Sequence, residues 1–448
     1  MAHDLASLTH ALLDAARKAG ADSADAFAID GTSVSIDVRN GGLEQAERAE
    51  AIDIGLRVLM GQRSANVSAS DVRPETMEAM ALRAVAMARE APEDPYIGLA
   101  EADQLARDWD ADALELFDDS PEPAPAALED DARRAEAAAL AVTGISQIDG
   151  ASAGYGAQRI HLAATNGFSG GYARSSRSIS CVAIAGTGTG MERDYDGDSR
   201  IFQSDLRLPE DIGRTAAART LDRMSPRRPK TGAYPVLFDE RISSSLIGHL
   251  LSAINGSAIA RGASWLLDGM GTQVLPAHLS LTEDPLRPRI MASRPFDAEG
   301  LATRPRTIVK DGVLTGWTLD LANARKLGLQ STANAARSTS GGPSPAPWNV
   351  ALTQGSESRE ELIAAMGTGL VVTSMIGATI NPNNGDYSRG AAGFWVENGA
   401  IAYPVSGITI AGNLRDMLRS LRPANDARPW LSRVVPSLLV EGLTLAGE

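Results

Sequence analysis

The first 223 residues alternate between stretches with a helical spacing of apolar residues and runs in which apolar and polar residues alternate. Helical spacing occurs at 4–19, 74–90, 127–141 and 208–222. Strand-like alternation occurs at 26–30, 33–38, 51–59, 64–70, 145–151, 159–165 and 172–185. Periods of 3.6 and 2 residues distinguish amphipathic helices from half-buried strands. The order helix, sheet, helix, sheet predicts an N-terminal α+β domain with an antiparallel sheet, made of two similar halves.

The pattern changes in the second half of the chain. Strand-like runs occur at 234–238, 307–310, 315–319, 349–353 and 370–375, whereas only 240–254, 319–327 and 359–366 have helical spacing. This pattern predicts a C-terminal, mostly antiparallel β domain with few helices. The basic, Pro-containing segment 224–232 is the expected boundary, so the predicted domains are 1–223 and 233–448. The Pro-rich, acidic stretch 91–126 is expected to be a linker that wraps the surface.

A β-hairpin is predicted near residue 398. The apolar run 391–396 is followed by Glu397-Asn398-Gly399 and then by the second run 401–405. Asn-Gly supplies the positive φ angles that a two-residue hairpin turn requires.

Composition and charge narrow the class of protein. Hydrophobic residues make up 44% of 448 residues, and a net charge of −14 repels a phosphate backbone, so no nucleic acid partner is expected. One cysteine, Cys181, excludes an intramolecular disulfide. The chain has neither a secretory leader nor a run of eighteen apolar residues, so we expect a soluble, cytoplasmic protein that does not enter a membrane.

Several segments together resemble the TldD/PmbA family, and its PmbA (TldE) branch in particular, the "modulator of DNA gyrase" type. The longest is the Gly- and Asn-rich stretch 381–413; shorter ones are 15–25, 294–300, 310–314, 324–329 and 438–447. Each segment alone is a weak signal, but together they cover nearly the whole chain. The resemblance implies a metallopeptidase family whose TldD branch carries zinc on a His-Glu-x-x-x-His helix, with a cysteine ligand in the C-terminal part.

This sequence departs from the zinc motif. When Gly256 and Arg261-Gly262 are aligned with the family pattern, Ile247 and Ser252 replace the two histidines, and Gly248 replaces the glutamate. His249 is out of register with both ligand positions. Catalytic zinc sites need three protein ligands, so we expect no catalytic residue, no metal and no cofactor in this chain. On a helix beside leucines, His249 is expected to be half-buried and hydrogen-bonded; its role stays open.

The resemblance therefore implies a zinc-free subunit. It would pair with a TldD-type zinc-bearing subunit to make a peptidase that acts on short or unfolded peptides, and would help to orient an extended peptide by strand addition. A homodimeric peptide-binding or structural protein without proteolytic activity is the alternative. Whether the chain pairs with itself or with a TldD chain is left open by the sequence.

The segment Gly385–Gly390 is the candidate for contact with a peptide or partner. Asp386, Tyr387, Ser388 and Arg389 combine a turn, an amphipathic ring and a guanidinium that can form two hydrogen bonds, a mixture found at interfaces. The alternative is that Asp386 and Arg389 only brace the following hairpin. A calcium loop is disfavoured, because Pro382 interrupts the pattern and no glutamate follows at the twelfth position.

A serine hydrolase is a third and weaker reading. Gly167-Phe-Ser-Gly-Gly171 matches the nucleophile-elbow pattern around Ser169, and His161 is the nearest histidine in sequence. The pattern requires a strand, a turn and a helix, but the run that follows has strand character. We therefore interpret 167–171 as a hairpin turn.

Overall fold

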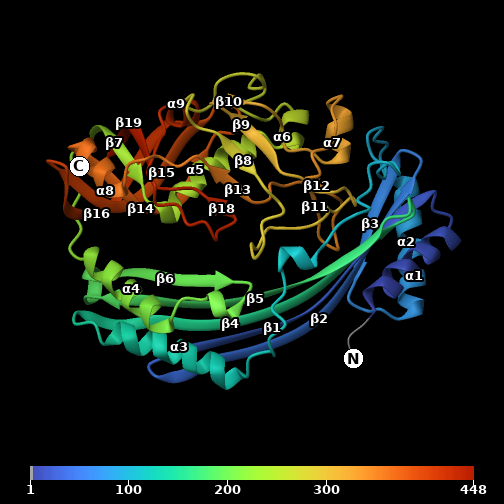
Figure 1. The fold of residues 1–448 in the computed structure, drawn as a ribbon, viewed down its shortest axis with the longest axis horizontal. Coiled ribbons are helices and arrows are strands. Elements are labelled where there is room, and N and C mark those ends of the chain that lie inside the picture. The colour runs from blue at the N-terminus through green and yellow to red at the C-terminus, as the bar shows by residue number, and fades with distance from the viewer. Residues whose placement is uncertain (1–3) are drawn as a thin grey trace.

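A curved antiparallel sheet forms the base of the N-terminal half (Figure 1). The computed structural model describes residues 4–448, without the side chain of Ala378, and within them this sheet has six strands in the order β3-β2-β1-β4-β5-β6. The strands are β1 (Ser23–Arg39), β2 (Gly42–Met60), β3 (Arg63–Ala69), β4 (Ile145–Ala164), β5 (Ser169–Ala185) and β6 (Glu192–Arg200). Strand β1 pairs antiparallel with both β2 and β4, so two three-stranded meanders meet at the centre of the sheet.

Each meander is flanked by two helices. The helices are α1 (Leu5–Lys18), α2 (Pro74–Glu90), α3 (Pro125–Leu140) and α4 (Pro209–Asp222). The side chain of Asp4 caps α1, and a proline opens each of the other three. Each half of the N-terminal domain therefore consists of a helix, three strands and a helix in chain order. The prediction of two similar halves is confirmed.

The predicted strands fuse into longer ones. Residues 26–30 and 33–38 were expected to be separate, but both lie in β1, and Gly31 between them is not a turn. A Cβ at Gly31 would lie 2.8 Å from the carbonyl oxygen of Ala157, so this glycine allows the neighbouring strand β4 to come close. Strand β4 likewise joins the runs predicted at 145–151 and 159–165.

The two faces of the sheet have different partners. Ala26 of β1 is buried against α1 and α2, and Ile36 is buried against α3 and α4. Because alternate residues of a strand share a face, both helix pairs cover the same face of the sheet. Asp25 and Phe27 face the opposite side, where the C-terminal half lies (Figure 1).

The C-terminal half contains a second large sheet that curls back on itself. In the described part of the chain its six strands run β16-β15-β14-β7-β19-β17, and an additional pairing brings the end strand β16 back to β19. They are β7 (Gly232–Phe238), β14 (Gly369–Ile380), β15 (Asp386–Glu397), β16 (Ala400–Asn413), β17 (Arg422–Pro423) and β19 (Leu438–Ala446). Strands β7 and β14 pair in parallel, and the other neighbours are antiparallel.

Shorter elements complete this half. A smaller sheet of this half consists of β8 (Leu281–Glu283), β9 (Arg306–Lys310), β10 (Val313–Leu314), β13 (Val350–Leu352) and β18 (Arg433–Val434). In addition, β11 (Ala335–Ala336) pairs with β12 (Ser344–Pro345). The helices are α5 (Glu240–Ala253), α6 (Gly256–Ala260), α7 (Leu321–Lys326), α8 (Arg359–Met366) and α9 (Leu414–Arg419). Short 3₁₀ turns lie at Asp112–Leu114, Gly188–Gly190 and Gln203–Asp205. The α+β fold class, with a β-rich C-terminal half, is confirmed.

One predicted strand was wrong, and one observed strand of the N-terminal sheet was not predicted. The strand expected at 315–319 is irregular, with only an isolated bridge from Thr318 to Asn255, and Trp317 and Leu319 fill the core from it. Strand β6 was not predicted, because its sequence is highly charged. Its Asp194 and Asp196 are buried and pair with arginines, a device that suits an edge strand.

The stretch 91–126 does more than wrap the surface. Ala100, Leu114 and Leu116 within it are buried. The backbone N–H of Ala106 donates to the carbonyl oxygen of Gly300 in the C-terminal half at 2.8 Å. The segment is therefore packed between the N-terminal sheet and the C-terminal half. Within the described residues, no helix combines the length and the apolar character needed to cross a lipid bilayer.

Candidate functional site

The positions that the family resemblance aligns with the zinc motif lie on helix α5. Asp239 caps this helix, and its apolar side packs into the core of the C-terminal half. Ile247 is completely buried there. The hydroxyl of Ser252 donates to the carbonyl oxygen of Gly248 at 2.9 Å, inside the helix. Ile247 therefore offers no metal-binding atom, and Ser252 offers only a hydroxyl that is hydrogen-bonded within the helix.

His249 faces strand β15. Its ring lies edge-on to Tyr387, with ring centroids 5.8 Å apart. The Nε2 atom is buried and has no hydrogen-bond partner among the described residues, so the hydrogen bond expected for this side chain is not made at Nε2. Burial, with a contribution from the charge of Arg389, lowers the pKa of His249 to about 4. The imidazole is therefore neutral at neutral pH.

The candidate segment around Tyr387 begins β15 and is not a loop. Tyr387 is only 2% exposed, its hydroxyl donates to the Sδ of Met375 at 3.2 Å, and burial raises its pKa to about 12. Arg389 donates from Nε to the carbonyl oxygen of Gly377 at 2.6 Å. The Tyr387 ring thus contacts His249 and Met375 within the chain, while Arg389 holds two neighbouring strands together.

Asp386 and Ser388 occupy the same strand. Asp386 is exposed and accepts hydrogen bonds from the amides of Asn384, at 2.7 Å, and Asn413, at 3.1 Å. Ser388 is half-buried and pairs with neighbouring strands on both sides. Asp386 therefore fastens the turn before β15, as in the bracing alternative, while its exposure keeps it available to a partner.

In the structure His249 lies close to Tyr387 and Arg389, although it is far from both of them in the sequence. This cluster does not suit zinc, because its charged neighbour is a cation and its other groups are a phenol and a thioether. Across the described residues, no three His, Cys, Asp or Glu side chains lie close enough to hold a metal ion.

Ser169 and His161 also approach each other. The Oγ of Ser169 lies 3.4 Å from Nε2 of His161, and Nδ1 of His161 lies 2.8 Å from Oγ1 of Thr9 on α1. A hairpin turn joins β4 and β5 as predicted, but it occupies 165–168, so Ser169 to Gly171 already belong to β5, and no helix follows. A threonine stands where a hydrolase triad has a carboxylate. The contact therefore fastens α1 to the sheet.

Cys181 lies in the sheet core. Its thiol is fully buried, and burial raises its pKa to about 12. A thiol with such a pKa is a poor nucleophile or metal ligand at neutral pH.

Comparison with known proteins places the chain in a family. Models of the PmbA/TldA metallopeptidase domains match residues 24–88 (domain 1), 118–224 (central domain) and 231–447 (C-terminal domain). The chain belongs to the PmbA/TldD family. It is 39% identical over 430 residues to the metalloprotease PmbA of Escherichia coli O157:H7, covering 95% of this chain and 93% of that protein.

Solved structures of PmbA/TldD type share the fold. A Bacteroides thetaiotaomicron protein described as a modulator of DNA gyrase superposes with a TM-score of 0.90 at 28% identity, covering 99% of this chain and 98% of that one. TldE of Thermococcus kodakarensis superposes with a TM-score of 0.83 at 20% identity, covering 98% and 99%. The second likeness is one of fold alone.

Proposed function

We propose that this member of the PmbA/TldD family is a non-catalytic, zinc-free subunit of a two-chain peptidase. It would pair with a TldD-type subunit that carries the zinc, and the pair would cleave short or unfolded peptides. A reducing cytoplasm suits a chain with the single cysteine Cys181. The observation that carries the proposal is the side-chain chemistry of helix α5, where Ile247, Gly248 and Ser252 replace the zinc motif.

The surroundings of these positions support the proposal. Ile247 is packed in the core, and a Cβ on Gly248 would lie 3.1 Å from a guanidinium nitrogen of Arg433. A glutamate at that position would meet an arginine instead of a metal-bound water. His249 lies against Tyr387 and close to the charge of Arg389, and neither group supports a dication.

A nearby exposed surface favours contact with a second chain. Ile376 is 81% exposed, and in the β14–β15 pairing it lies opposite Gly390, next to Arg389. Exposed isoleucine beside an arginine is the composition of an interface anchor, and strand edges are commonly covered by a partner. We assign the partner-binding surface to this end of β14 and β15.

Reconstitution with the TldD-type protein from the same organism tests the proposal. The purified chain alone is expected to contain no stoichiometric zinc and to leave denatured casein intact. The mixture is expected to cleave casein in a chelator-sensitive reaction, and the two chains should co-elute. Chelator-sensitive cleavage by the isolated chain, or full activity of the partner alone, would refute the proposal.

The same experiment distinguishes the proposed two-chain peptidase from the homodimeric alternative. A homodimeric binding protein would elute at twice 46.9 kDa and would neither co-elute with the zinc-bearing chain nor change its activity. The variant Ile376→Asp serves as a surface probe: it should abolish co-elution under our proposal. Ile401→Asp, which changes another exposed isoleucine at 47% exposure, is the matched control.

A further inference from the structure

A cavity of about 320 Å³ lies between the open face of the N-terminal sheet and two loops of the C-terminal half. Strands β1, β4 and β5 form its floor, and the segments 294–298 and 336–337 close it from above. Apolar side chains make up much of its wall: Phe27, Ile29, Leu162, Tyr172 and Phe296. The volume suits a ligand the size of one amino acid residue.

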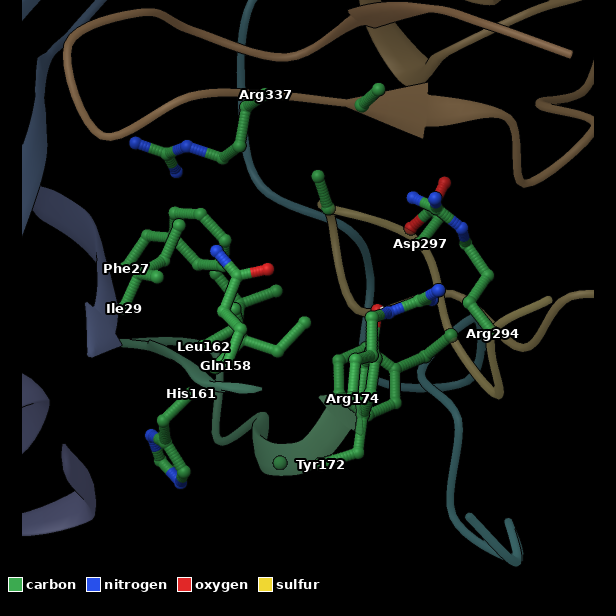
Figure 2. Close-up of a pocket in the computed structure, with 15 residues that line it drawn as sticks. Phe27, Ile29, Gln158, His161, Leu162, Tyr172, Arg174, Arg294, Asp297 and Arg337 are labelled. Carbon is green, nitrogen blue, oxygen red and sulfur yellow. The ribbon is translucent and has the colours of Figure 1, made fainter. Parts of the chain in front are cut away.

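Arginines from three separate segments reach this cavity. Figure 2 shows Arg337 on the side of Phe27 and Ile29, and Arg174 and Arg294 on the other side with Asp297. His161 points away from the space, toward α1. The arrangement brings positive charge to both sides of an otherwise apolar space.

Several of the N–H groups of these arginines have no partner. The Nε of Arg294 is buried without a hydrogen bond among the described residues, and its guanidinium lies 3.6 Å above the ring of Trp348. The side chain of Arg337 is completely buried; its Nη1 pairs with Asp25, but Nε and Nη2 lack partners. Buried donors without acceptors are rare, and each invites an explanation such as a bound ligand.

The neighbouring carboxylates do not neutralise these groups. Asp25 is shared between Arg337 and Arg57. Asp297 lines the cavity but accepts three backbone N–H groups, from Glu299, Leu301 and Ala335. Arg174 donates to the carbonyl oxygens of Met291 and Ser293 and has no carboxylate partner in the described part of the chain. Arg174 and Arg294 therefore stand against the single carboxylate of Asp297, which leaves net positive charge on this side of the cavity.

We propose that this cavity binds an apolar monocarboxylate. The carboxylate would accept hydrogen bonds from Arg294, beside Arg174 on the same side of the cavity, and the apolar body would lie against Phe27, Leu162 and Phe296. A guanidinium matches a carboxylate in geometry and charge. A doubly charged phosphate is disfavoured, because the carboxylates of Asp25 and Asp297 stand close by. The site is independent of the proposed subunit role, since it needs neither zinc nor a partner chain.

Calorimetric titration of the full chain tests the proposal. N-acetyl-L-leucine is expected to bind one site at least about tenfold more tightly than N-acetyl-L-leucinamide, which lacks the charge that forms the ion pair. Inorganic phosphate is expected not to compete. Comparison with 4-methylpentanoate shows where the bound carboxylate comes from. Tighter binding of N-acetyl-L-leucine than of 4-methylpentanoate indicates a peptide C-terminus, and equal binding of the two indicates a free acid.

Variants locate the site. Arg294→Gln should weaken binding of N-acetyl-L-leucine at least about tenfold, while Arg193→Gln, which changes an exposed arginine of β6, should leave it unchanged. Ala298→Leu should fill the cavity and block binding while the melting temperature is kept. Equal binding of the acid and its amide, tighter binding of phosphate, or unchanged affinity in both cavity variants would overturn the proposal.

Discussion

Asp25 and Arg337 form a buried ion pair although 312 residues separate them in the sequence. Asp25 lies on the open face of strand β1, and Arg337 follows β11 in the C-terminal half. The same carboxylate also pairs with Arg57 of β2. Burial raises the pKa of Asp25, but the charges of Arg337 and Arg57 lower it by a larger amount. The net shift of the pKa is therefore downward, and the carboxylate stays charged. The pair fixes how the two halves of the chain meet.

Removing this carboxylate should strongly destabilise the protein. Asp25→Ala leaves Arg57 and Arg337 buried without their counter-ion, and losing one partner of a buried pair costs about 3–5 kcal/mol. Urea denaturation of the isolated chain measures the loss. The control is Asp14→Ala, whose partner Arg17 is exposed, and it should change the free energy of unfolding by less than about 0.5 kcal/mol. Similar values for both variants would contradict the prediction.

A close contact between the halves gives a second prediction. A Cβ at Gly55 of β2 would overlap the backbone carbonyl of Thr339, which cannot swing away as a side chain would. Gly55→Ala should therefore destabilise the chain by about 1–3 kcal/mol through overpacking. Gly150→Ala in β4, where no atom lies within 4 Å of the added Cβ, should be neutral or slightly stabilising. A melting temperature for Gly55→Ala equal to that of Gly150→Ala would refute this.

The helices and strands that were predicted correctly are those marked by signals in nearby residues of the sequence. Helix α2 was predicted at its observed bounds because Pro74 opens it, and α8 was predicted at 359–366 from its helical spacing. In the structure a capping box at Ser358 begins α8, and Gly367 ends it. The β15–β16 hairpin follows from Asn398 and Gly399, which adopt φ angles of 54° and 76°. Each of these signals acts within a few residues, so the sequence displays it directly.

The groupings that depend on tertiary structure could not be predicted. His249 was expected to be a half-buried residue out of register with the zinc motif, and Tyr387 was placed in a contact segment, but only the packing of α5 on β15 shows that they touch. The cavity arginines were missed for the same reason, although Arg294 belongs to a segment that carries the family resemblance. No spacing rule connects Arg294 with Phe27, which reach the cavity from different halves of the chain.

The buried imidazole gives a prediction on pH dependence. The pKa of His249 in the folded chain is about 4, below the value of about 6.5 for an unfolded histidine. As the pH falls from about 6.5 toward 4, the unfolded chain takes up a proton that the folded chain does not. The free energy of unfolding should therefore decrease over this range by linkage.

The variant His249→Gln, which cannot titrate, should lose less stability than the wild type between pH 7 and 4.5. Urea denaturation at several pH values measures the difference. His278→Gln removes an exposed histidine and should follow the wild-type curve. If His249→Gln also follows it, the imidazole is not the group responsible.

The variant Arg389→Ala distinguishes binding of a partner chain from a purely local role of Arg389 in holding β14 and β15 together. Its Nε holds the carbonyl oxygen of Gly377, and one partly exposed hydrogen bond contributes about 0.5–1.5 kcal/mol. Arg389→Ala should therefore lower the melting temperature of the isolated chain by only about 2–4 °C, but should weaken co-elution with the zinc-bearing subunit at least about tenfold if the guanidinium lies in the interface. The matched control is Arg287→Ala, which removes an arginine that also donates to a backbone carbonyl, that of Leu431 at 3.2 Å. A large fall in melting temperature with unchanged assembly would assign Arg389 to bracing alone, because the guanidinium would then serve the β14–β15 pair and not the partner.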